Sequence, residues 1–222
     1  MILPTVASRA LGIVSVVSTA SNSPAVVSLS GTGVTLLLSA TPATLSFGNV
    51  TVGSSSSQTV TLTNTGTGSV TVSQATVAGA GFSISGLSLP LTLTAGQSAN
   101  FIAIFAPTTA GSASGSVSVA STATNSPAVV SLLGAGVTLL LSANPSSTNF
   151  GNIVLGSSST LPVILTNTGT GSVTISQAIV TRMGFSISGL SLPLSLTAGR
   201  IRVSVRRLHP PQPAVPPATF PL

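Results

Sequence analysis

The nine residues TNTGTGSVT occupy positions 63–71 and return unchanged at positions 166–174, which is 103 residues further along the 222-residue chain. Other stretches repeat at the same spacing, among them NSPAVVSL (22–29 and 125–132) and GVTLLLSA (33–40 and 136–143). Solenoid repeats are shorter, about 20–50 residues, whereas one β-sandwich domain has roughly 100 residues. The spacing therefore predicts sandwich domains in tandem.

Two stretches around the repeated motif follow the pattern of half-buried strands. QTVTLTN (58–64) and SVTVSQATV (69–77) place valine or leucine at alternate positions, and the TGTG between them predicts a turn. SGSVSVAS (114–121) and AVVSLLG (128–134) predict two more strands, whereas ANFIAIFAP (99–107) predicts a central strand buried on both faces. The predicted fold class is all-β, with tandem immunoglobulin-like β-sandwich repeats of about 103 residues.

The composition excludes most catalytic and metal chemistry. The chain has no Asp, Glu, Lys, Cys, Trp or Tyr, so its titratable side chains are six arginines and His209. General acid–base catalysis, carboxylate calcium sites and zinc sites need groups that are missing here. His209 lies in a proline-rich stretch and is expected to be a solvated loop residue. The sequence predicts no enzyme activity, no catalytic residues, no cofactor and no metal site.

The positive charge is confined to the ends of the chain. No charged side chain occurs from residue 10 to residue 181, and four of the six arginines fall within residues 200–207. A nucleic-acid surface needs basic residues spread over a folded face, so no nucleic-acid partner is expected. No apolar run is long enough for a membrane span. The uncharged Ser- and Thr-rich composition favours an extracellular or cell-surface location.

A set of motifs carries a family resemblance over residues 36–137. These are LSFGNV (45–50), TNTG (63–66), FAPTTAG (105–111) and the closing LLGAG (132–136). Together they resemble the choice-of-anchor D repeat, which is grouped with the ASH (abnormal-spindle/Hydin) domains and their major-sperm-protein-like immunoglobulin relatives. The resemblance implies a sandwich of seven to eight strands without a shared catalytic site. Similar bacterial repeats stand in tandem in secreted or surface proteins, and eukaryotic relatives are scaffolding modules of cilia and centrosomes.

The aromatic and glycine landmarks of the motifs have structural interpretations. The phenylalanines are expected in the core: Phe47, Phe82, Phe101 and Phe105. The glycines are expected at turns where a side chain would clash: Gly48, Gly66 and Gly111.

The repeat predicts four segments. Residues 1–35 correspond to the last strands of a truncated repeat, 36–137 to a complete sandwich, 138–199 to the first two-thirds of a second repeat, and 200–222 to an Arg/Pro-rich tail. The apolar stretch 10–20 also fits the core of a signal peptide, although its counterpart 103 residues on is an internal strand.

The tail has two interpretations. A shifted codon consists of the third base of one residue's codon and the first two bases of the next. Read in this way, the junction Gly199/Arg200 allows Gln. The junctions from His209 onward allow the amino acids found at residues 107–115, in the same order. The favoured hypothesis is therefore a disordered tail produced by the loss of one nucleotide. The alternative is a genuine extended tail that binds acidic or proline-recognising partners.

Three functions remain open. The first is a non-catalytic structural or adhesive repeat module of a bacterial secreted or cell-surface protein. The second is an ASH-like protein-binding scaffold, and the third is an accessory domain of a larger surface enzyme. The expected partners are other proteins at sheet edges or neighbouring repeats, and strand-exchanged self-association is a further expectation because two segments are partial repeats.

Overall fold

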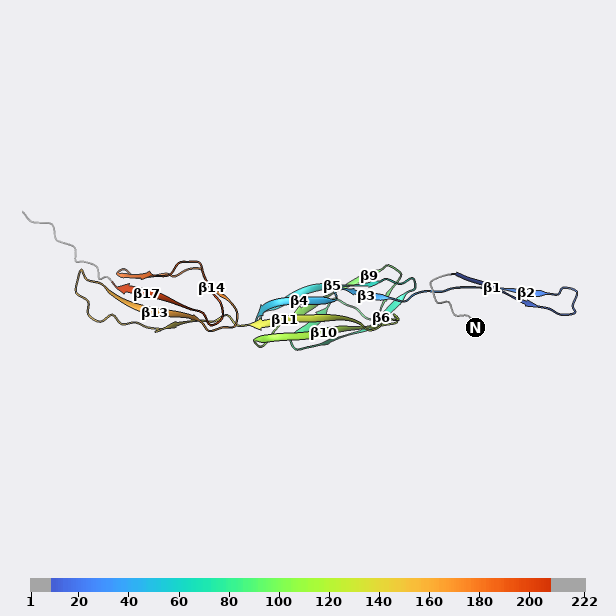
Figure 1. The fold of residues 1–222 in the computed structure, drawn as a ribbon, viewed down its shortest axis with the longest axis horizontal. Coiled ribbons are helices and arrows are strands. Elements are labelled where there is room, and N and C mark those ends of the chain that lie inside the picture. Colours follow the sequence, from blue (N-terminus) through green and yellow to red (C-terminus); the bar gives the residue numbers. More distant parts are fainter. Residues whose placement is uncertain (1–8, 209–222) are drawn as a thin grey trace, which may run out of the picture. The chain divides into compact units, whose positions relative to one another are not determined.

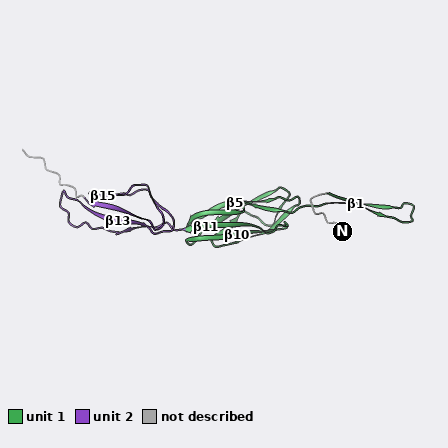
Figure 2. Cartoon of the chain, viewed as in Figure 1, with its two compact units in different colours: residues 1–136 green, residues 137–222 purple. Residues whose placement is uncertain are grey.

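The structure is a computed structural model that describes residues 9–208. These residues form seventeen β-strands and no helix, which confirms the all-β prediction (Figure 1). No helix capable of crossing a membrane is found in this part of the chain. The chain divides into two units, residues 1–136 and 137–222 (Figure 2).

Nine strands of unit 1 form a sandwich of two sheets. One sheet has the order β4-β11-β10-β6-β8 and the other the order β3-β5-β9-β7. The strands are β3 (Leu38–Thr41), β4 (Thr44–Thr51), β5 (Ser56–Asn64), β6 (Val70–Ala78), β7 (Phe82–Ser85), β8 (Leu91–Leu93), β9 (Ser98–Phe105), β10 (Gly111–Ser121) and β11 (Ala128–Val137). The count exceeds the seven to eight strands implied by the resemblance because three short strands, β3, β7 and β8, line the sheet margins.

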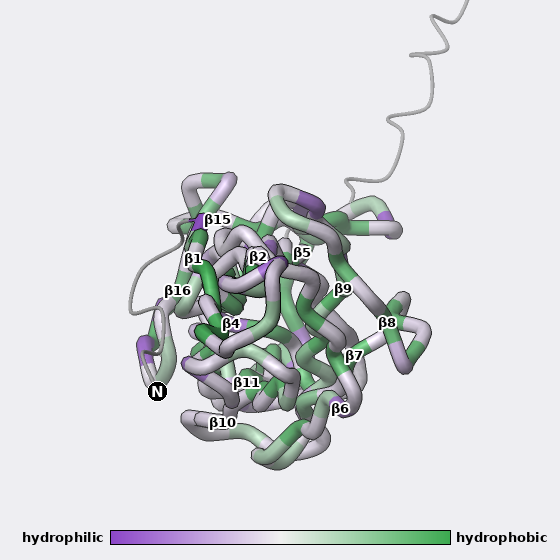
Figure 3. Tube along the Cα trace, turned by 90° about the vertical axis from the view of Figure 1, so that its right-hand side faces the viewer, coloured by the Kyte–Doolittle hydropathy of each residue, from purple (hydrophilic) through white to green (hydrophobic). Residues whose placement is uncertain are grey.

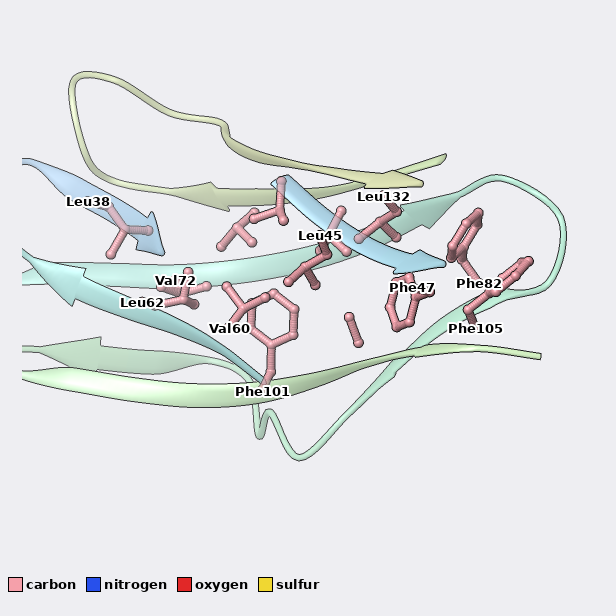
Figure 4. Packing of buried hydrophobic residues seen from close by; sticks show 14 of the residues in the cluster. Leu38, Leu45, Phe47, Val60, Leu62, Val72, Phe82, Phe101, Phe105 and Leu132 are labelled. Carbon is pink, nitrogen blue, oxygen red and sulfur yellow. The ribbon is translucent and has the colours of Figure 1, made fainter. Parts of the chain in front are cut away.

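The core between these sheets is built by alternate side chains of each strand (Figure 4). The four predicted phenylalanines all lie in it, which confirms that expectation. Three of them pack together, with ring centroids 4.6 Å apart for Phe82 and Phe105 and 5.8–5.9 Å apart for their contacts with Phe47. Val60 and Leu62 of β5 point into the same core, as their alternation predicted.

The prediction that 99–107 is buried on both faces is wrong. The segment forms β9, which is central because it pairs with both β5 and β7. Phe101, Ala103 and Phe105 are buried, whereas Ile102 is 41% exposed. Each sheet of a two-layer sandwich has only one covered face, so the outward side chains of even a central strand meet solvent.

The three predicted glycines are required for different structural reasons. A Cβ at Gly66 would collide with the Thr35 carbonyl, which confirms the expected clash. Gly48 and Gly111 have open space around them, and their φ angles of +65° and +131° explain the glycine instead. Gly48 also lies within β4 rather than at a turn.

The remaining described strands of unit 1 form a separate hairpin of β1 (Arg9–Val16) and β2 (Ala25–Thr32). Their register runs from Arg9 opposite Thr32 to Val16 opposite Ala25. All sixteen residues are exposed.

Unit 2 has fewer strands. They are β12 (Leu141–Asn144), β13 (Ser159–Asn167), β14 (Val173–Ile175), β15 (Phe185–Ser188), β16 (Leu194–Leu196) and β17 (Ile201–Leu208). Four of them form one sheet of order β12-β13-β17-β15, and β14 pairs with β16 alone.

The expected disorder from residue 200 is wrong for residues 201–208. This segment forms β17, which pairs with β13 over eight positions and with β15 over four. Its alternation of Ile201, Val203 and Val205 with polar residues has the period of a strand, and two neighbouring strands satisfy its backbone. Residues 209–222, including His209, lie outside the described residues.

Candidate interaction surface

The described residues contain neither a cluster of metal ligands nor an unsatisfied buried polar side chain. No group of three or more potential metal ligands occurs among residues 9–208. Every buried side-chain nitrogen and oxygen in this part of the chain has a hydrogen-bond partner. The strand edges and the exposed apolar faces of the described residues are the candidate interaction surfaces.

The repeated TNTGTGSVT motif is explained by one buried asparagine. The Asn64 amide nitrogen donates to the carbonyls of Gly68 and Leu93, both at 2.8 Å, and its side-chain oxygen accepts from the Gly66 amide at 2.9 Å. Asn64 is fully buried. The asparagine therefore holds the end of β5, the following turn and β8 together.

Unit 2 repeats this arrangement. Asn167 donates to the carbonyls of Gly171 and Leu196 at 2.8 and 2.7 Å and accepts from the Gly169 amide at 2.9 Å. Sequence reasoning interpreted the motif as a turn and missed the asparagine. The signal was available, because an Asn two residues before a Gly is typical of a side chain that bonds to the backbone ahead of it.

The hairpin exposes a large amount of apolar surface. Its exposed apolar side chains include Leu11, Ile13, Val14, Val16, Val26, Val27 and Leu29. Figure 3 shows few strongly hydrophilic stretches along the chain. Because contiguous exposed apolar residues mark interaction sites or aggregation hazards, the hairpin is a candidate interaction surface.

Unit 2 provides a second candidate, on the inner face of its larger sheet. One cavity of about 250 Å³ is lined by Leu141, Val163, Leu165, Ile175 and Ile187, among others. An adjoining cavity of about 370 Å³ is lined by Phe150, Val180 and Phe185 together with Arg182 and Arg206. Both cavities share Ile179, Ile187 and Arg206. The inner face of unit 2 is therefore hollow, and many of the side chains that line it are apolar.

Arg206 places a charged side chain on this face. Its guanidinium donates to the Thr148 hydroxyl at 3.4 Å, across the larger cavity. The chain has no Asp or Glu side chain that could neutralise it. Sequence reasoning placed Arg206 in a disordered tail and did not foresee a position between apolar residues.

Comparison with known proteins supports the domain class. Residues 35–137 match the family model described as Cep192 domain 4. They form an immunoglobulin-like β-sandwich domain. No curated protein matches the chain.

Two solved structures are similar over much of the chain. A protein of unknown function from Porphyromonas gingivalis W83 has 14% identity and a TM-score of 0.38, covering 78% of this chain and 83% of its own. The secreted serine protease VesC from Vibrio cholerae has 13% identity and a TM-score of 0.37. That alignment covers 74% of this chain and 45% of VesC.

Proposed function

We propose that residues 35–137 serve as a non-catalytic structural or adhesive module of a bacterial secreted or cell-surface protein. The observation that carries the proposal is a closed sandwich with no titratable side chain within it. Such a domain has no acid, base, thiol or metal ligand, and its remaining capacity is to hold a shape and present a surface.

We infer further that unit 2 is a second, incomplete copy of the same domain, and that the copies belong to the choice-of-anchor D type. The motifs LSFGNV (45–50), TNTG (63–66) and FAPTTAG (105–111) support the type, and the correspondence of strands supports the second copy. The bounds of β12, β13, β15, β16 and β17 equal those of β3, β5, β7, β8 and β9 plus 103 residues. The repeated asparagine network supports the same inference.

A direct test is surface labelling of the bacterium that encodes the chain. Antibodies raised against residues 35–137 are expected to stain intact cells or to detect the protein in the culture medium. Staining that requires permeabilised cells would contradict the surface role. An antibody against a cytosolic protein of the same cells controls for leakage.

The second candidate function, a protein-binding scaffold of the ASH type, is favoured by one strand edge. Among the four edge strands of the sandwich, β3, β7 and β8 have three or four residues, whereas β4 has eight. A long free edge is able to accept an extended peptide as an added strand.

The test of the scaffold function is a proline scan of β4. Proline at alternate positions blocks backbone bonding on one side of a strand only. A scaffold partner is expected to lose binding when the outward-bonding positions are changed, while the paired positions affect folding. Binding unaffected by both sets would exclude this edge.

A further inference from the structure

Unit 2 retains one complete sheet of the sandwich and part of the other. Its sheet β12-β13-β17-β15 has the same order as β3-β5-β9-β7, strand for strand at the 103-residue offset. Of the five-stranded sheet β4-β11-β10-β6-β8, only β14 and β16 have counterparts, to β6 and β8. The described part of unit 2 therefore lacks the layer that β10 and β11 supply in unit 1.

The segments of unit 2 that would border this layer have lost their strand structure. β6 has nine residues and pairs with β10 from Val72 to Ala78, whereas β14 ends at Ile175 and residues 176–181 form no strand. Likewise, β4 borders β11 in unit 1, and its counterpart, residues 147–154, forms no strand. Strands need a partner for their backbone groups, so both segments are the margins of a vacant place in the sheet.

The β1–β2 hairpin is a copy of the β10–β11 hairpin. Both have the same register at the 103-residue offset, since Val16 faces Ala25 as Val119 faces Ala128. Their turns are closed in the same way, by the amide of Ser18 donating to the Ser23 hydroxyl at 2.8 Å and that of Ser121 to Ser126 at 2.9 Å.

The hairpin also presents the core side chains that unit 2 lacks. The β10–β11 hairpin contributes four fully buried side chains to the sandwich core: Val117, Val119, Val130 and Leu132. The residues 103 positions earlier are identical, namely Val14, Val16, Val27 and Leu29. All four are exposed in β1 and β2. They match the apolar lining of the two cavities of unit 2.

The space around Gly12 also indicates that the hairpin docks on unit 2. In the sandwich, a Cβ at the equivalent Gly115 would collide with the Ala78 carbonyl and the Phe82 ring. A Cβ at Gly12 would meet only the Leu29 Cβ, at an ordinary 3.9 Å. The hairpin itself therefore does not require glycine, whereas docking beside Phe185, the counterpart of Phe82, does.

The path of the chain favours a second copy over the same chain as the source of the hairpin. The backbone of Leu38, where the sandwich begins, bonds to Asn125 in the turn between β10 and β11. From that turn β11 runs ten residues to Val137 at the opposite end, roughly 30 Å away. The hairpin and unit 2 are thus connected to opposite ends of the sandwich.

We propose that the β1–β2 hairpin of one copy completes the open sandwich of unit 2 in a second copy. β1 pairs antiparallel with residues 177–181, with Val14 opposite Val180, and the Ser28 amide donates to the Ser146 carbonyl. Both contacts follow those of unit 1, where Val117 pairs with Val77 and the Ser131 amide donates to the Ala43 carbonyl. The hairpin residue lies 103 positions before its counterpart in unit 1, and the unit 2 residue lies 103 positions after its counterpart. The proposal does not depend on where the protein works in the cell.

Such a contact is head-to-tail, because donor and acceptor are different surfaces. Within the described residues 9–208, each copy offers one hairpin and one unit 2, so association continues into linear chains unless a ring closes. Arg206 stands where Ala103 is buried in the sandwich, so its guanidinium must remain at the cavity rim near Thr148. Burial of its charge opposes docking, and the expected affinity is weak.

The first experiment compares two neighbouring valines of β2 in the full 222-residue chain. Val26 and Val27 are 56% and 55% exposed. The counterpart of Val26 is Val129, which stays exposed in the sandwich, whereas that of Val27 is the buried Val130. Sedimentation velocity over a concentration series is expected to show oligomers for the native chain and for Val26→Asp. Val27→Asp is expected to weaken association by at least about tenfold, because a charge would enter the core. Equal effects of both changes, or a native chain that stays monomeric, would overturn the proposal.

The second experiment tests the register and remains informative if Val27→Asp disturbs the hairpin. The chain has no cysteine, so single-cysteine variants report one contact each. Mixed Val14→Cys and Val180→Cys chains are expected to form a disulfide-linked heterodimer on oxidation. Val14→Cys mixed with Ile179→Cys is the control, since adjacent residues of a strand point to opposite faces. Equal crosslinking of both mixtures would indicate unspecific aggregation. Crosslinking within one chain of a Val14→Cys/Val180→Cys double variant at high dilution would indicate the same chain as the donor. Either result would overturn the proposal.

Discussion

The sandwich of unit 1 and the open sheet of unit 2 share a scaffold but differ in closure. Both keep the buried asparagine with the same three hydrogen bonds, through Asn64 and Asn167. In unit 1 the Phe82 side chain is 9% exposed, and in unit 2 its counterpart Phe185 is 43% exposed. Local hydrogen bonding is therefore enough to preserve the order of strands in the sheet. Burial of the core requires the second sheet, which contains β10 and β11 in unit 1.

The third strand of the two sheets shows the difference most sharply. β9 and β17 occupy equivalent positions, but β9 turns Phe101, Ala103 and Phe105 inward. β17 turns Ser204 and Arg206 inward and leaves Ile201 and Val203 on the solvent side. The apolar pattern of β17 is displaced by one residue, and such a displacement exchanges the two faces of a strand.

The largest expected effect is the loss of a core aromatic side chain. Phe101→Ala should lower the free energy of unfolding of the sandwich by about 3–5 kcal/mol, because a fully packed ring leaves a cavity. Its counterpart change, Ser204→Ala, removes only a long hydrogen bond to the Val163 carbonyl, at 3.4 Å, and should cost about 0.5–1 kcal/mol. Urea unfolding followed by circular dichroism measures both. Similar losses in the two variants would remove the distinction between a closed and an open core.

Removal of the buried asparagine should destabilise both units by the same amount. Asn64→Ala and Asn167→Ala each leave two carbonyls and one amide without a partner, at a cost of about 2–3 kcal/mol. Hydrogen exchange at the Gly66 and Gly169 amides, read by mass spectrometry of the flanking peptides, reports each site separately. The exposed Asn100→Ala is the matched control. An effect confined to unit 1 would show that Asn167 does not stabilise its unit independently.

Restoring the core pattern of β17 should strengthen the contact between copies. The triple change Ser204→Phe, Arg206→Ala and Leu208→Phe recreates the inward side chains of β9 on the acceptor face. Removal of the guanidinium alone, in Arg206→Ala, should tighten association by about tenfold. Sedimentation velocity provides the dissociation constants. Unchanged association in both variants would show that docking does not bury this face.

The smallest expected effect is that of pH on the sandwich. Residues 35–137 contain no Asp, Glu, His, Cys, Tyr, Lys or Arg, so folded and unfolded chains bind the same number of side-chain protons. The derivative of stability with pH is then zero, and the free energy of unfolding should stay constant within about 10–15% between pH 3 and 9. Urea unfolding of the isolated domain checks this. A marked slope would mean that the domain has been assigned the wrong boundaries.

Much of the fold follows from the sequence, and the exceptions have physical reasons. The alternation in β5 and β6 and the four phenylalanines identify one face of each sheet, because burial imposes a period of two. The outer face of β9 is apolar without being buried, as Ile102 shows, so hydrophobicity alone overstates its burial. The strand at 201–208 was missed because arginine and proline dominate the composition of the tail. The partner of the hairpin depends on registers that only the structure displays.

The most direct test of the account is hydrogen exchange of the full chain at two protein concentrations. The amides of β5 and β9 should be protected at both, since the sandwich of unit 1 is closed within one copy. The amides of residues 177–181 should exchange rapidly in dilute solution and become protected at high concentration, when hairpins of other copies pair with them. Protection of residues 177–181 that does not change with concentration would contradict the account.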